Sequence, residues 1–169
     1  MMQNTGSKIL DGDICDANML SELFANNEFT HIVNLAARPG VRVSLKRPME
    51  TIRNNIDCFT ILLEQIIQSH QGRTMPRLLF ASSSSVYGLN KVVPYSETHD
   101  VNTPSNLYGA SKRSDELIAH AYHHLYGLST VGFRFFTVYG PWGRPDMAAH
   151  LFTSSILNNE TITLYNDGK

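Results

Sequence analysis

Two side chains capable of acid–base chemistry stand four residues apart in the string Tyr108-Gly-Ala-Ser-Lys112. On a helix this spacing places both on one face, where the lysine ammonium can hold the phenol and favour its anionic form. A free phenol has a pKa of about 10, so a tyrosine needs such a cationic neighbour to act as a base near neutral pH. Together with the upstream string Ala81-Ser-Ser-Ser-Ser-Val-Tyr-Gly88, the pair indicates a hydride-transfer site.

The elements that must position this pair follow from hydrophobic patterning. Short apolar runs that end in small or polar residues, as buried parallel strands do, occupy residues 31–37, 77–83 and 130–137. Helical periodicity predicts helices at residues 16–27, from Pro48 through an apolar stripe to Ile67, from Thr103-Pro104 to Gly127, and at residues 147–158. Residues 161–165 are expected to form a last short strand.

Strands that alternate with helices of this length predict an α/β fold built of right-handed βαβ units on a parallel sheet. In a doubly wound sheet the ligand lies beyond the carboxyl ends of the strands. Three segments follow the predicted strands at that edge: Ala36-Ala37, Ser82 to Ser85, and Thr137 to Arg144. The chemistry is therefore expected there.

Composition excludes several classes of partner. The 169 residues suffice for one core, and 14 basic against 15 acidic residues give no electrostatic footprint for nucleic acid or an anionic membrane. Without a signal core or a membrane-length apolar run, we expect a soluble chain whose Cys15 and Cys58 are reduced packing residues. His120, His123 and His124 have no other ligands nearby and are interpreted as a solvated face, so no metal is expected.

Four strings in order carry a resemblance to the extended short-chain dehydrogenase/reductases, the NAD-dependent nucleotide-sugar epimerases and dehydratases. They are Leu35-Ala-Ala-Arg-Pro-Gly-Val-Arg42, Ala81-Ser-Ser-Ser-Ser-Val-Tyr-Gly-Leu89, Leu107-Tyr-Gly-Ala-Ser-Lys112 and Arg134-Phe-Phe-Thr-Val-Tyr-Gly-Pro-Trp-Gly-Arg-Pro-Asp-Met147. Within the family they are most similar to enzymes that epimerise UDP-glucuronate at C4. A Tyr-x-x-x-Lys alone is a weak signal, but four strings at strand ends and helix starts are specific.

The resemblance implies a role for each matching residue. Catalytic roles fall to Ser83, Tyr108 and Lys112. The NAD cofactor is expected to contact Asp13, Ile14, Ala36, Ala37, Asn55, Tyr108 and Lys112. The UDP-sugar substrate is expected to contact Ser84, Ser85, Thr137 and Arg144.

The chemistry implied by the resemblance is inversion of C4 through a 4-keto sugar. Tyr108 removes the 4-OH proton while the C4 hydride passes to NAD, and Ser83 hydrogen-bonds the oxygen as it becomes a ketone. Because the 4-keto uronate is a β-keto acid that loses carbon dioxide readily, Thr137 and Arg144 are expected to grip its carboxylate. Ser84-Ser85 replace the Asp-Glu pair of the 4,6-dehydratases. A UDP-glucuronate decarboxylase and a UDP-glucose 4-epimerase-like enzyme remain alternatives.

The chain departs from its family at both ends. Gly6 and Gly12 are the only glycines before Gly40, so no Gly-x-x-Gly-x-x-Gly turn for the cofactor pyrophosphate is present. We therefore expect a partial Rossmann-like doubly wound parallel sheet, residues 1–169 as one partial epimerase/dehydratase domain, lacking the first strands and most of the C-terminal substrate domain.

Two hypotheses remain open for this shortened chain. It is a partial copy of an epimerase, weak or inactive alone, or it is a pseudoenzyme or interaction module that pairs through the apolar sheet edge left at residues 31–35. For the full-length form the resemblance implies a cytoplasmic homodimer, with a Golgi membrane anchor in a longer form left open.

Overall fold

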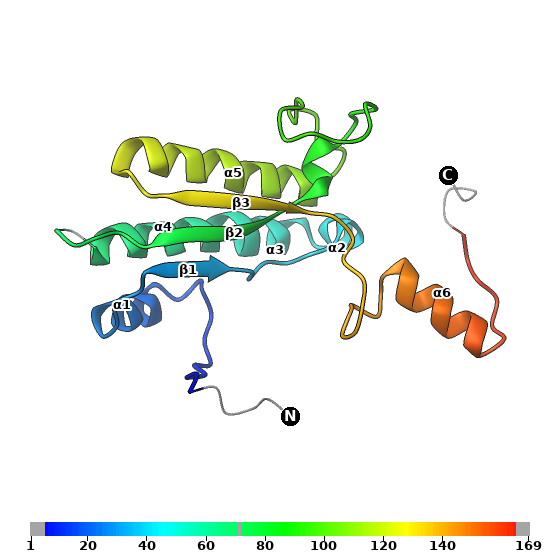
Figure 1. Cartoon of the computed structure of the whole chain (residues 1–169), viewed down its shortest axis with the longest axis horizontal. Coiled ribbons are helices and arrows are strands. Elements are labelled where there is room, and N and C mark those ends of the chain that lie inside the picture. Colours follow the sequence, from blue (N-terminus) through cyan, green and yellow to red (C-terminus); the bar gives the residue numbers. More distant parts are fainter. Residues whose placement is uncertain (1–5, 71, 165–169) are drawn as a thin grey trace. The chain divides into compact units, whose positions relative to one another are not determined.

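The computed structural model describes residues 6–70 and 72–164. The chain divides between Arg134 and Phe135 into two compact units. A parallel sheet of three strands has the order β1-β2-β3 (Figure 1): β1 (His31–Asn34), β2 (Arg77–Ser83) and β3 (Thr130–Phe135). All of the sheet except Phe135, the last residue of β3, belongs to the first unit. The parallel register pairs His31 with Arg77 and Asn34 with Phe80. The predicted α/β fold with a partial parallel sheet is confirmed, although β1 and β3 end before the predicted runs do.

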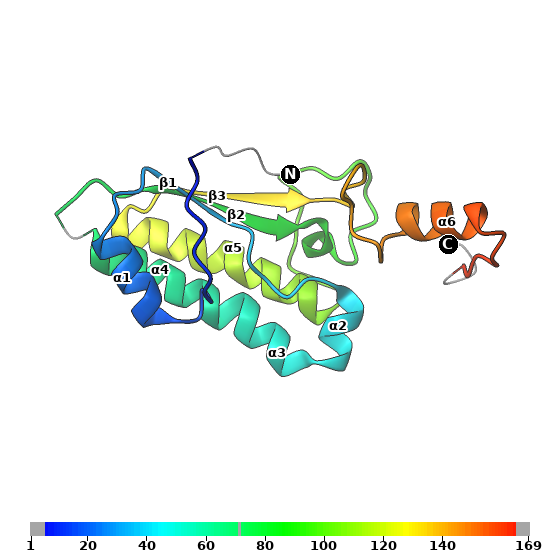
Figure 2. The same cartoon turned by 90° about the horizontal axis from the view of Figure 1, so that it is seen from below.

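Helices α1 (Ala17–Ala25), α4 (Cys58–Ser69) and α5 (Leu107–Tyr126) lie on one face of the sheet (Figure 2). The apolar stripe predicted after Pro48 is the buried face of α4, and it packs on the central strand β2, whose Leu78 and Phe80 are buried. Burial of this apolar surface is the main stabilising term for the unit. The core consists of Leu20, Phe24, Phe59, Leu62, Leu63, Ile66, Leu78, Phe80, Ala119 and Leu128.

Capping residues set the helix ends. The Asp16 carboxylate accepts hydrogen bonds from the backbone N–H groups of Asn18 and Met19, so α1 begins at Ala17. Asn106 caps α5 in the same way through the Gly109 N–H, which places the helix start after the predicted Thr103-Pro104 entry. Gly127 ends α5 as predicted, in the left-handed conformation with φ of 72°.

The predicted helix after Pro48 is interrupted. It consists of α3 (Pro48–Ile52), a π-helical turn η1 (Arg53–Asp57) and then α4. The extra residue in a π turn shifts the side chains that follow, and such turns are frequent at functional sites. Here the turn holds the Asn55 side chain in the interior. Two short elements were not predicted: α2 (Val41–Lys46) and the 3-10 helix η2 (Ser84–Tyr87).

The second unit contains α6 (Ala148–Leu157), which confirms the helix predicted at residues 147–158. The predicted strand at residues 161–165 is wrong for residues 161–164, which have no strand conformation; Tyr165 lies outside the described residues. A strand requires a neighbour for its backbone hydrogen bonds, and the β-rich composition of this segment cannot supply one.

The edge of the sheet at β1 is apolar, as expected. Val33 and Leu35 are 60% and 66% exposed, and within residues 6–70 and 72–164 no further strand pairs with β1. Its role as a template for pairing stays a prediction. Among the helices of the described residues, none combines the length and apolar character that crossing a bilayer requires.

Candidate active site

The serine run and the tyrosine–lysine helix meet at the carboxyl end of β2. Ser83 is the last residue of the strand, and its hydroxyl accepts the Ser85 N–H at 3.2 Å, which starts η2. The first turn of α5 lies against η2 so closely that a Cβ at Gly109 would stand 2.5 Å from the Ser85 carbonyl oxygen. Glycine at position 109 is therefore required for this approach, which brings the residue after Tyr108 onto the serine run.

Asn55 ties the loop after β1 to α5. Its Oδ1 accepts the Arg38 N–H at 2.7 Å, and its Nδ2 donates to Ser111 Oγ at 2.9 Å and to the Arg38 carbonyl oxygen at 3.3 Å. All of its hydrogen-bonding groups thus serve protein partners, so Asn55 fixes the loop that carries Ala36 and Ala37. Direct contact between Asn55 and a cofactor stays a prediction.

Lys112 is directed toward the interior of the fold. Its Nζ donates to Asp115 Oδ2 at 3.1 Å, and the two side chains are 5% and 1% exposed. Burial raises the pKa of Asp115 to about 7, against the lowering effect of Lys112. Within the part of the chain that the structure describes, no hydrogen bond joins the Tyr108 hydroxyl to Lys112 or Ser83. The catalytic roles of these three residues stay predictions.

A partly buried ionic network that the sequence did not reveal joins β2 and β3 to α5. Glu116 accepts hydrogen bonds from Arg134 Nε and Nη2 at 2.9 and 3.0 Å, from Ser82 at 2.6 Å and from Arg113 at 2.9 Å. Burial acts to raise the pKa of Glu116, but the hydrogen bonds from Arg134 and Ser82 hold it below its ordinary value. The hydrogen bond to Glu116 also raises the pKa of Arg134. The available signals were an arginine inside an apolar strand and a glutamate one turn after Lys112.

We expect Arg134→Met to lower the free energy of unfolding by about 1–3 kcal/mol, because it leaves the partly buried Glu116 carboxylate without its bidentate partner. Urea unfolding followed by circular dichroism measures the change. Arg113→Met is the matched control: it removes a more exposed partner of the same carboxylate and is expected to cost below about 1 kcal/mol. Equal costs for the two variants contradict this account.

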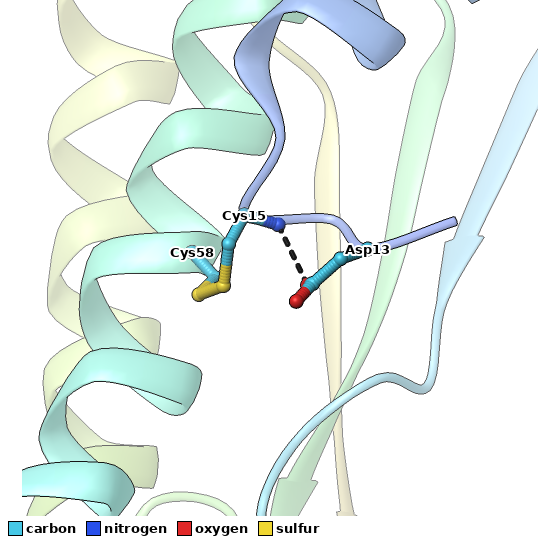
Figure 3. A group of neighbouring side chains, drawn as sticks. All are labelled: Asp13, Cys15 and Cys58. Atoms are coloured by element: carbon cyan, nitrogen blue, oxygen red, sulfur yellow. Dashed lines mark hydrogen bonds between the residues drawn. A yellow bond between two sulfur atoms is a disulfide. The ribbon is translucent and has the colours of Figure 1, made fainter.

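The expectation of two reduced cysteines is wrong in this structure, because Cys15 and Cys58 form a disulfide with a Cα–Cα distance of 4.4 Å (Figure 3). The bond joins the turn before α1 to the first residue of α4, a contact that a separation of 43 residues does not reveal. The Asp13 carboxylate also lies near the Cys58 sulfur at the start of α4 (Figure 3). Contacts of Asp13 and Ile14 with a cofactor stay predictions. The Asp13 carboxylate accepts the Cys15 N–H at 2.9 Å and so shapes this turn.

Among the described residues, the one group with ligand atoms close enough for a metal ion is Asp13, Cys15 and Cys58. Its sulfurs are bonded to each other, whereas zinc binds thiolates. His120 and His124 are exposed on α5, which confirms the solvated face predicted for them.

Thr137 and Arg144 lie in the second unit, both exposed. The Arg144 guanidinium binds the Asp146 carboxylate through two bonds, Nε to Oδ1 at 3.0 Å and Nη2 to Oδ2 at 2.5 Å. The hydrogen bonds from Arg144 hold the pKa of Asp146 below its ordinary value. The fork of Arg144 therefore has the geometry that recognises a carboxylate.

Comparison with known proteins agrees with this geometry. The model of the NAD dependent epimerase/dehydratase family matches residues 2–169. UDP-glucuronate 4-epimerase 5 of Arabidopsis thaliana is 48% identical over 165 residues, which cover 98% of this chain and 37% of the relative. Protein CapI of Staphylococcus aureus is 48% identical over 149 residues, 88% of this chain and 43% of the relative.

Solved structures extend the comparison to the fold. UDP-glucuronic acid 4-epimerase from Bacillus cereus, in complex with UDP-glucuronic acid and NAD, superposes with a TM-score of 0.85 at 34% identity. The superposition covers 98% of this chain and 50% of that one. The chain thus spans half or less of the length of these relatives. It belongs to the NAD-dependent epimerase/dehydratase family.

Proposed function

We propose that this chain is the catalytic part of an NAD-dependent UDP-glucuronate 4-epimerase that interconverts UDP-glucuronate and UDP-galacturonate. The observation that carries the proposal is the close approach of η2 and α5 at Gly109, which places Ser83 to Ser85 next to the helix turn of Tyr108. The names of the relatives support the substrate, since six UDP-glucuronate 4-epimerases of Arabidopsis thaliana match at 46–50% identity.

The described residues fit the reactive end of a nicotinamide cofactor. At the carboxyl end of β1 the chain continues with Ala36 and Ala37, whose small side chains leave the backbone accessible, and the Asn34 side chain fixes this turn by accepting the Ala36 N–H at 3.1 Å. NAD, when bound, accepts the C4 hydride and returns it to the other face of the sugar. The turn that would hold its pyrophosphate is not encoded among these 169 residues.

The chain's own residues act on the proton and the oxygen of the sugar 4-OH group. Tyr108 takes the proton of the 4-OH, Ser83 donates a hydrogen bond to the same oxygen, and Lys112 stabilises the phenolate by its charge. After the flat 4-keto sugar has rotated in the site, Tyr108 returns the proton to the C4 oxygen. No net oxidation of the sugar results.

For the uronate carboxylate, we propose Thr137 and Arg144 as the specificity element. The bidentate bond that Arg144 forms with Asp146 supports this role, because a substrate carboxylate presents the same two oxygens to the fork. A held carboxylate cannot align with the keto group for loss of carbon dioxide. The role requires Arg144 to exchange Asp146 for the substrate.

We expect Arg144→Ala to weaken binding of UDP-glucuronate about 10- to 100-fold and binding of UDP-glucose by much less, because only the uronate loses a charge-assisted hydrogen bond. Calorimetric titration of the full-length protein that contains this sequence measures both affinities. Arg42→Ala is a control at an exposed arginine. Equal losses for the two sugars would remove Arg144 from the role.

The activity itself is tested by incubating the full-length protein with UDP-glucuronate and NAD and following the sugar by proton NMR. UDP-galacturonate is the expected product. Release of carbon dioxide with a pentose product would instead assign a decarboxylase, and turnover of UDP-glucose alone would assign a hexose 4-epimerase. We further infer that the full-length protein is a homodimer, which light scattering tests.

A further inference from the structure

Tyr108, Lys112 and Asp115 stand at positions i, i+4 and i+7 of α5, which form one stripe along a helix. Lys112 is therefore the middle group, with a phenol one turn before it and a carboxyl group one turn after it. The Tyr-x-x-x-Lys motif contains Tyr108 and Lys112 but does not include Asp115. In the structure the ammonium is bonded to the third, at 3.1 Å.

The surroundings of Asp115 disfavour its ionised form. Its side chain is 1% exposed, and its Oδ1 has no hydrogen-bond partner among the described residues. The carboxylate thus receives one hydrogen bond where an ionised carboxylate needs several. Burial accordingly outweighs the attraction of Lys112 and raises the pKa of this carboxyl group to about 7.

Charged groups that act on Asp115 come from its own helix. Lys112 lowers its pKa, and Glu116 raises it. The elements packed on α5 carry these other titratable groups: Arg77 of β2, Tyr87 of η2, Arg42 and Lys46 of α2, Glu50 of α3, Arg53 and Asp57 of η1, and Glu64 of α4.

We propose that Asp115 is a positioning residue for Lys112, which holds the ammonium one turn away from Tyr108 and competes with the Tyr108 phenolate for it. The inference rests on the proposed function, because it assigns Lys112 to Tyr108 during catalysis. A neutral Asp115 leaves the positive charge free to support the phenolate. An ionised Asp115 draws the ammonium back, so support for Tyr108 declines as pH rises through neutrality.

The first test needs no activity and uses the 169-residue chain. In the ¹³C-labelled chain we expect the Asp115 carboxyl carbon to titrate with a midpoint of about 7, and Lys112→Met to raise this midpoint by at least about one pH unit. Asp57→Asn, an exposed acid on η1, is the control that leaves it unchanged. A midpoint near 4 in the folded chain overturns the proposal.

The pH dependence of the free energy of unfolding is a second test of the raised pKa of Asp115. Between about pH 4 and 7 the unfolded chain ionises Asp115 while the folded chain keeps it protonated, so stability falls as pH rises across this window. We expect the urea midpoint to fall across this range in the wild type, and Asp115→Asn to remove the fall. Persistence of the same fall in Asp115→Asn overturns the assignment.

The positioning role is read from the pH profile of the full-length protein. We expect kcat of the wild type to decline with a midpoint of about 7, and Asp115→Asn to lose this alkaline limb while KM for the sugar stays unchanged. An alkaline limb that Asp115→Asn retains overturns the role. If the protein shows no epimerisation at all, the proposed function fails. The ¹³C titration and the stability measurement on the 169-residue chain still decide whether Asp115 beside Lys112 is protonated below neutral pH.

Discussion

We expect Tyr108→Phe to lower the epimerase turnover proposed for the full-length protein about 10²- to 10⁴-fold, the range expected when a single acid–base group is removed. The phenyl ring retains the packing of the partly buried side chain on α5, so the fold is preserved. What disappears is the hydroxyl that, in the proposed mechanism, takes the 4-OH proton. Because Ser83 and Lys112 remain, we expect KM for the UDP-sugar to change little.

The measurement is kcat for the conversion of UDP-glucuronate by the full-length protein, followed by NMR. Tyr126→Phe is the matched control, since it removes a hydroxyl from an exposed position at the other end of α5 and is expected to keep full turnover. NAD content, read from absorbance after denaturation, confirms that the cofactor is retained. Turnover of Tyr108→Phe within a few-fold of the wild type would exclude Tyr108 as the base.

Reduction of the Cys15–Cys58 disulfide has the largest expected effect on stability. The bond closes a loop with a sequence separation of 43 residues, and the chain-entropy account assigns such a closure about 4 kcal/mol. For a chain of this size that corresponds to a drop in Tm of roughly 8–16 °C. The disulfide also links the turn that contains Asp13 to α4, and its reduction removes this covalent link.

Thermal unfolding of the 169-residue chain with and without dithiothreitol measures this effect. The double variant Cys15→Ala/Cys58→Ala is the control, because it lacks the bond and its Tm is expected to be insensitive to the reductant. Mass spectrometry after alkylation counts the free thiols in each sample. The account fails if the native chain is alkylated at both cysteines without reductant, or if complete reduction leaves Tm unchanged.

Local patterns in the sequence predicted the elements that carry the site. The apolar run at Arg77–Ser83 became β2 with those bounds, and Gly127 ends α5 where the pattern placed it. Both signals are local: burial on two faces shows as a continuous apolar run, and a left-handed residue favours glycine. The motif from Tyr108 to Lys112 likewise places its residues through helical spacing alone.

Features that depend on contacts between distant segments could not be predicted from the hydrophobic pattern of the sequence. The π turn that holds Asn55 interrupts a helix whose apolar periodicity reads as continuous, because the side chain is held by Arg38 and Ser111 from other segments. The strand predicted at residues 161–165 failed for residues 161–164 because strand formation depends on a neighbour and not on composition.

The sequence by itself determined the α/β class, the helix that carries Tyr108 and Lys112, and the family to which these residues belong. Only the tertiary structure decided that Cys15 meets Cys58, that Arg134 meets Glu116, and that Lys112 is bonded to Asp115. The first set depends on periodicity within one element. The second depends on burial, since a charged or sulfur-containing side chain acquires its partner and its pKa from what the packed elements place around it.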